Sequence, residues 1–141
     1  AVIQFPSVNQ VSMKEMAIHN ALTGCIGETW SAVLLRYQSE HAPKYNGVFK
    51  RIAKDETSHA EFSWVLHEWL MSQLTTDEQG EVHRAMGGML ATAPEAKSLR
   101  ALSMGEMSAK TSVRAWKVFS KQIERMMSGD RRFEEAVHFR N

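Results

Sequence analysis

The sequence predicts an all-α protein, and three observations support this prediction. Apolar residues recur at the three- and four-residue spacing of helices, and no stretch alternates apolar and polar residues as strands do. Ser12 with Glu15, and Thr75 with Glu78, fit the capping-box pattern that marks the first turn of a helix. Only 3 of the 141 residues are proline, so few positions interrupt a helix. A single helical domain is expected.

The first half of the chain predicts two long helices joined by a tight turn. Residues 1–11 lack helical periodicity and are interpreted as an extended N-terminal arm. A first helix over 13–41 stops before Pro43, because the residue that precedes a proline disfavours the α conformation. A second helix spans 46–74. The two helices are expected to fold back on each other at the turn.

Two shorter helices are expected in the second half. One covers 76–92 and is weakened by two adjacent glycines, each costing about 1 kcal/mol relative to alanine. The other covers 109–127, where an apolar stripe has helical spacing. The helical part of the domain is therefore predicted to be 12–128, and 129–141 is predicted to be a charged tail.

The composition excludes several classes of function. The net charge of +1 at pH 7 gives no reason to expect nucleic acid or an anionic membrane surface as a partner. No apolar stretch approaches the length of a membrane span. The single cysteine, Cys25, rules out an internal disulfide and a thiolate-rich zinc site. The cytoplasm is the default expectation for the compartment, while export or processing from a precursor stays open.

Three residues on the two long helices are candidate metal ligands: Glu28, Glu56 and His59. On a regular helix each lies on an apolar face, where a carboxylate is costly unless it is paired or binds a cation. Glu28 precedes Pro43 by almost the same number of residues as His59 follows it, so the side chains are expected at one level of the hairpin. Carboxylate oxygens and an imidazole nitrogen in a dry interior suit iron or manganese, with zinc as a further option.

Residues 23–70 resemble the second helix pair of the ferritin-like di-iron proteins, a superfamily that includes ferritins and rubrerythrins. The matching motifs are GET, which contains Glu28, and the D-E-x-x-H-A run that starts at Asp55. The resemblance implies a ferritin-like helical bundle, with two long antiparallel helices plus two shorter C-terminal helices. It also implies that Glu28 is a terminal carboxylate ligand, Glu56 a bridging one and His59 a nitrogen ligand. Asp55 would then orient a ligand histidine by hydrogen bonding.

The chain carries one such ligand set, whereas a complete di-iron site takes two. Glu106 and the E-x-x-H run at Glu135 do not supply the second set, because Glu106 lies much farther from the turn at Gly129 than Glu135 does. Two copies could pair about a two-fold axis, a solution that encapsulated ferritins resemble. A second chain or a missing precursor segment could instead supply the other half. Alternatively, the site holds one metal or none, and the helices serve assembly.

The resemblance implies a di-iron oxidoreductase of the ferroxidase type, which oxidises iron or uses O2 or peroxide at a centre shared between chains. Completion by a homodimer or a second chain is favoured, because Glu28 and Glu56 need counter-charge. The alternative is a structural or assembly subunit with a ferritin-like fold and a vestigial or purely structural metal site.

Three further features of the sequence bear on metal chemistry. Cys25 lies one turn before Glu28 and could be near the metal, although a buried cysteine usually acts as a small apolar residue. His67 is interpreted as a residue at the edge of the core or of a second site. The nine methionines fit helical cores and indicate no copper site without a clustered motif.

Overall fold

The computed structural model describes residues 10–94 and 105–129, and every regular element in these ranges is a helix. The predicted all-α class is confirmed for this part of the chain. The predicted arm, 1–11, and tail, 129–141, fall almost entirely outside the described residues. None of the described helices is long and apolar enough to cross a membrane.

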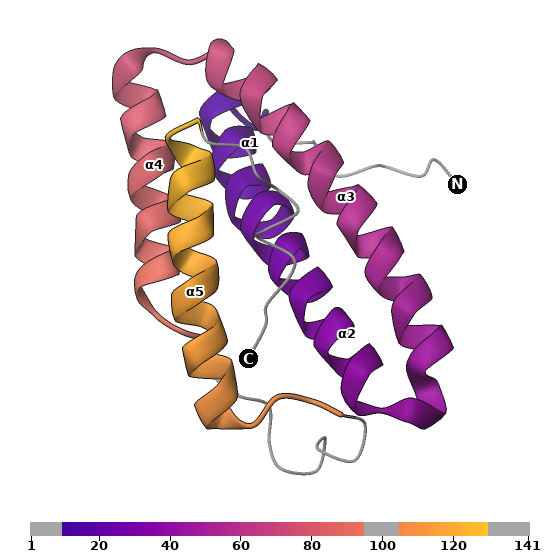
Figure 1. Ribbon diagram of the computed structural model, residues 1–141. Helices are drawn as coiled ribbons and strands as arrows, with labels where there is room; N and C mark the ends of the chain where they lie inside the picture. Colours follow the sequence, from indigo (N-terminus) through magenta and orange to yellow (C-terminus); the bar gives the residue numbers. More distant parts are fainter. Residues whose placement is uncertain (1–9, 95–104, 130–141) are drawn as a thin grey trace, which may run out of the picture.

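The first predicted helix is present but is not regular throughout. α1 (Met13–His19), the π-helical segment η1 (Asn20–Glu28) and α2 (Thr29–His41) follow one another without a break (Figure 1). The helix starts at the predicted capping box, in which the Ser12 amide donates to the Glu15 carboxylate at 2.7 Å. The π segment was not predicted, and its i→i+5 bonding changes which residues share a face.

The second long helix, α3 (Asn46–Ser72), runs antiparallel to the first (Figure 1). A 3-10 turn, η2 (Pro43–Tyr45), joins the two helices close to where Pro43 predicted an interruption. Asn46 Nδ2 donates to the Ser39 carbonyl at 2.6 Å and so ties the start of α3 to α2. The helix ends two residues before the predicted end at 74.

Two shorter helices complete the described fold: α4 (Thr76–Ala91) and α5 (Ala109–Met127). Both agree with their predicted ranges within one residue, and α4 starts at the predicted capping box of Thr75 and Glu78. In Figure 1, α4 and α5 lie together on one side of the molecule, while α3 forms the opposite edge. One side of α3 is therefore turned away from the other helices.

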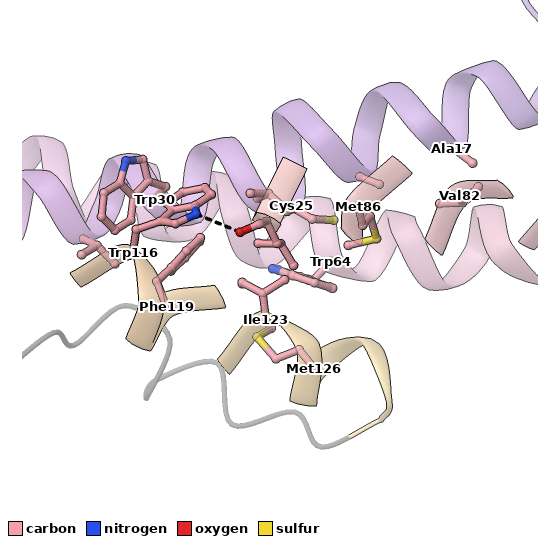
Figure 2. Packing of buried hydrophobic residues seen from close by; sticks show 14 of the residues in the cluster. Ala17, Cys25, Trp30, Trp64, Val82, Met86, Trp116, Phe119, Ile123 and Met126 are labelled. Atoms are coloured by element: carbon pink, nitrogen blue, oxygen red, sulfur yellow. Dashed lines mark hydrogen bonds between the residues drawn. The ribbon is translucent and has the colours of Figure 1, made fainter. Parts of the chain in front are cut away.

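Aromatic side chains from α2 and α5 occupy one end of the core (Figure 2). The Trp30 ring meets Trp116 edge-to-face at 4.9 Å between centroids, and Phe119 lies 5.1 Å from Trp30. Trp116 Nε1 donates to the Leu90 carbonyl at 3.0 Å, which links α5 to the end of α4. Burying side chains of this size stabilises the fold by about 1.5–3 kcal/mol each.

The long N-terminal helix and α3 approach closely at Gly24. A Cβ atom at this position would lie 2.6 Å from Ser63 Oγ and 2.8 Å from Ser63 Cβ, so only glycine fits. Ala53 and Ala60, on the same buried side of α3, are also small. Small residues on both helices thus permit the close contact.

We expect Gly24→Ala to lower the free energy of unfolding by about 1–3 kcal/mol, because the added methyl group overpacks the contact with Ser63. Gly88→Ala is the matched control. A Cβ there meets no atom within 4 Å, so the change should raise the free energy of unfolding by about 0.5–1 kcal/mol. Urea denaturation measures both values. A Gly24→Ala protein as stable as the wild type would contradict the close contact.

Candidate metal centre

Glu28, the last residue of η1, is half-buried and is held by α3. Ser63 Oγ donates to Glu28 Oε2 at 3.2 Å. The carbonyl of the same serine accepts from Asn20 Nδ2 at 2.9 Å and from Cys25 Sγ at 3.3 Å. A single residue of α3 therefore fixes the position of the Glu28 carboxylate relative to the second helix.

Glu56 and His59 lie on α3 before Ser63, toward the hairpin turn. Glu56 is half-buried, whereas His59 is exposed, and so is Asp55. Within the described part of the chain, none of these three side chains makes a hydrogen bond or an ion pair. The expected bond from Asp55 to a ligand histidine is thus not formed with His59 in the single chain.

The three predicted ligands do not converge within one chain. In the ranges 10–94 and 105–129, no three His, Cys, Asp or Glu side chains are grouped closely enough to hold a metal ion. Helical side chains lean toward the N-terminus, so on antiparallel helices Glu28 and Glu56 lean in opposite directions. His59 is displaced by about 60° around the helix from Glu56, toward solvent. The expectation of a dry site inside one chain is therefore not met, and the role of the three residues as ligands stays a prediction.

The outward side of α3 carries five exposed apolar side chains, which we define as the apolar stripe: Val48, Ile52, Phe62, Val65 and Trp69. Their exposed fractions are 59%, 39%, 67%, 65% and 53%. The exposed Arg51 and Asp55 lie between these apolar side chains on the same side of the helix. The inward side of α3 instead uses Phe49, Ala53, Ala60 and Leu70, which are buried. Clustered exposed apolar side chains mark interaction surfaces, and His59 lies among them.

Cys25 is fully buried one turn before Glu28. Burial raises the pKa of its thiol well above the usual range, and the negative charge of Glu28 raises the pKa further. The thiol therefore stays protonated near neutral pH, where it donates to the Ser63 carbonyl. It contributes a hydrogen bond beside Glu28, and its predicted role near a metal stays a prediction.

Buried polar residues that sequence reasoning had not singled out set the register of the two helices. Trp64 Nε1 donates to Thr29 Oγ1 at 3.3 Å, and Thr29 in turn donates to the Cys25 carbonyl. Together with Asn20 and Ser63, these residues form the polar contacts around Glu28. The sequence feature that could have identified these residues is the presence of small polar side chains on otherwise apolar helix faces.

Comparison with protein-family models, curated proteins and solved structures finds no match to this chain. The functional proposal therefore rests on the geometry of the described residues.

We expect the wild-type protein to lose stability as the pH rises past about 9, the ordinary pKa of a thiol. The folded state holds Cys25 protonated while the unfolded state ionises, so alkaline pH favours unfolding. Below that pH both states are protonated and this contribution is fully present. Urea denaturation from pH 7 to 10 should show a steeper loss for the wild type than for Cys25→Ala. Parallel curves for the two proteins would contradict the assignment.

Proposed function

We propose that the chain is a ferritin-like non-haem di-iron protein, and that a second copy of the same chain completes its metal centre. The function would be oxidation of Fe(II), or the use of O2 or peroxide. The observation that carries the proposal is the position of His59, exposed and without a partner among the described residues, inside the apolar stripe of α3.

The stripe supports a two-fold arrangement centred near His59. Val48 and Trp69 are its first and last residues, and the midpoint between them falls beside His59. If two copies of α3 pack antiparallel through the stripe, a two-fold axis at this midpoint brings both E-x-x-H motifs together. Each half of the centre would then come from one copy, as the four-helix di-iron pattern requires.

Charge along α3 favours a second copy over an unrelated chain. Lys50 and Lys54 lie on one flank of the stripe in the first half of the helix, and Glu61 and Glu68 lie on the same flank in the second half. In an antiparallel pair of identical helices, the basic half of one flank faces the acidic half of the other. Opposite charges at the rim of an apolar contact fix orientation and register.

The donor set fits iron in its chemistry. Glu28 and Glu56 supply anionic oxygens, and His59 supplies a neutral nitrogen, a combination that suits iron or manganese and accommodates zinc. Ser63 bonds to Oε2 of Glu28 and so orients the carboxylate before any cation binds. Bound iron would supply the redox chemistry. Packing of the stripe would exclude water from the site, which strengthens the attraction between the carboxylates and a cation.

A structural subunit is the second candidate, because the three ligands do not converge in the single chain. In that case the same stripe would pair two chains without any metal. The two experiments below separate these functions, since one tests pairing and the other tests iron.

We expect Phe62→Glu to shift the protein from dimer to monomer, because a charge replaces the most exposed apolar side chain of the stripe, at 67%. Val118→Glu on α5 is the matched control, since Val118 is also exposed, at 47%, but lies outside the stripe. Sedimentation velocity measures the oligomeric state. A monomeric wild type, or a dimer that only the Val118 variant disrupts, would contradict pairing through α3.

We expect protein loaded with Fe(II) to retain about two iron ions per dimer, as the di-iron pattern requires, and Glu56→Ala to lose the bound iron. Glu124→Ala is the control, because it removes an exposed carboxylate of α5, away from both the proposed centre and the apolar stripe. Elemental analysis after size-exclusion chromatography measures the metal. A metal-free dimer in the wild type would leave the structural function as the better account.

A further inference from the structure

A pocket of about 370 Å³ lies where α3, α4 and α5 meet, on the opposite side of α3 from the apolar stripe. Trp64 forms part of its wall and meets His67 edge-to-face at 5.7 Å between ring centroids. The side chains with metal-binding potential that line it are His67, Glu68, Met71, His83, Met126 and Met127. It is separate from the residues assigned above to the di-iron centre.

Three helices supply the donors. His67 and Met71 are four residues apart on α3 and therefore lie on the same face of that helix. Met126 and Met127 are the last two residues of α5, and His83 comes from α4. Residues far apart in the sequence thus bring two imidazoles and three thioethers to one pocket.

The lining favours a soft monovalent cation. Thioether sulfur is a soft and neutral ligand that selects Cu(I), whereas harder divalent ions prefer carboxylate and water oxygens. Among the described residues, Glu68 is the one carboxylate that lines the pocket, and His67 is only 6% exposed. A single positive charge therefore needs less compensation here than a divalent ion would.

The end of α5 adds a second favourable feature. Met126 and Met127 occupy the final turn of that helix, at the negative end of the helix dipole. A cation is stabilised at this end of a helix. Core packing alone explains a buried methionine such as Met126, which lies near Ile123 in Figure 2, but it does not require two imidazoles in the same pocket.

We propose that this pocket is a Cu(I) site, in which His67, His83 and the thioethers of Met71, Met126 and Met127 are the ligands. Sequence reasoning did not predict a copper site, because most of these ligands lie far apart along the chain. Folding gathers three methionines with the two histidines. The proposal stands independently of the di-iron function.

The test is an anaerobic titration of the whole chain with Cu(I), kept reduced by ascorbate and in competition with a chromophoric copper chelator. We expect the wild type to bind one Cu(I) per chain. The double variant Met126→Leu/Met127→Leu should bind at least about tenfold more weakly, because it removes two soft donors. Leucine conserves volume closely enough to keep the fold, which circular dichroism would check.

Three further variants serve as controls for this titration. Met16→Leu/Met89→Leu removes two methionines that do not line the pocket, and it should bind Cu(I) as the wild type does. His83→Gln changes an exposed ligand, so it should weaken binding without unfolding the chain. Equal affinity in the wild type and the Met126/Met127 variant, or displacement of Cu(I) by equimolar Zn(II), would overturn the proposal. Glu56→Ala should leave Cu(I) binding unchanged, which separates this site from the di-iron centre.

Discussion

Ser63 meets the long N-terminal helix with both its hydroxyl and its carbonyl group. The hydroxyl donates to Glu28, while the carbonyl accepts from Asn20 and from the thiol of Cys25. This contact requires glycine at position 24, because a Cβ there would collide with Ser63. The helices are thus locked in one register, and buried polar groups would be left without partners if that register slipped.

This register decides which residues of α3 face inward and which face outward. Small residues lie against the first helix, and large apolar side chains such as Phe62 and Trp69 are left on the outside. His59 consequently lies in an apolar surface, and Glu56 lies at its border with the core. The same orientation turns His67 inward, toward the pocket shared with α4 and α5. The outward and inward sides of α3 therefore each contribute to a different candidate metal site, one for iron and one for copper.

Much of the fold was predictable because local signals mark the helix ends. The capping boxes at Ser12 and Thr75 and the break at Pro43 act within a few residues, so they can be recognised in the sequence. The π segment was not predictable from these signals. It changes the phase of the helix at Glu28, where sequence reasoning had assumed regular periodicity.

The candidate site was predictable in its residue types but not in its geometry. Two apolar lines run along α3, one through Phe49 and Leu70 and one through Val48 and Trp69, and periodicity alone does not say which is buried. The choice depends on close packing against Gly24, which is a tertiary contact. The pocket lined by methionine and histidine forms only where three helices meet, so no local sequence pattern predicts it.

Anomalous diffraction at the iron absorption edge, from crystals of the iron-loaded protein, tests directly whether two copies share one metal centre. We expect two copies packed through α3, with anomalous peaks between the Glu56 and His59 side chains of both copies and with Glu28 beside them. Peaks confined to one chain away from these residues, or copies that leave the apolar stripe uncovered, would contradict this expectation.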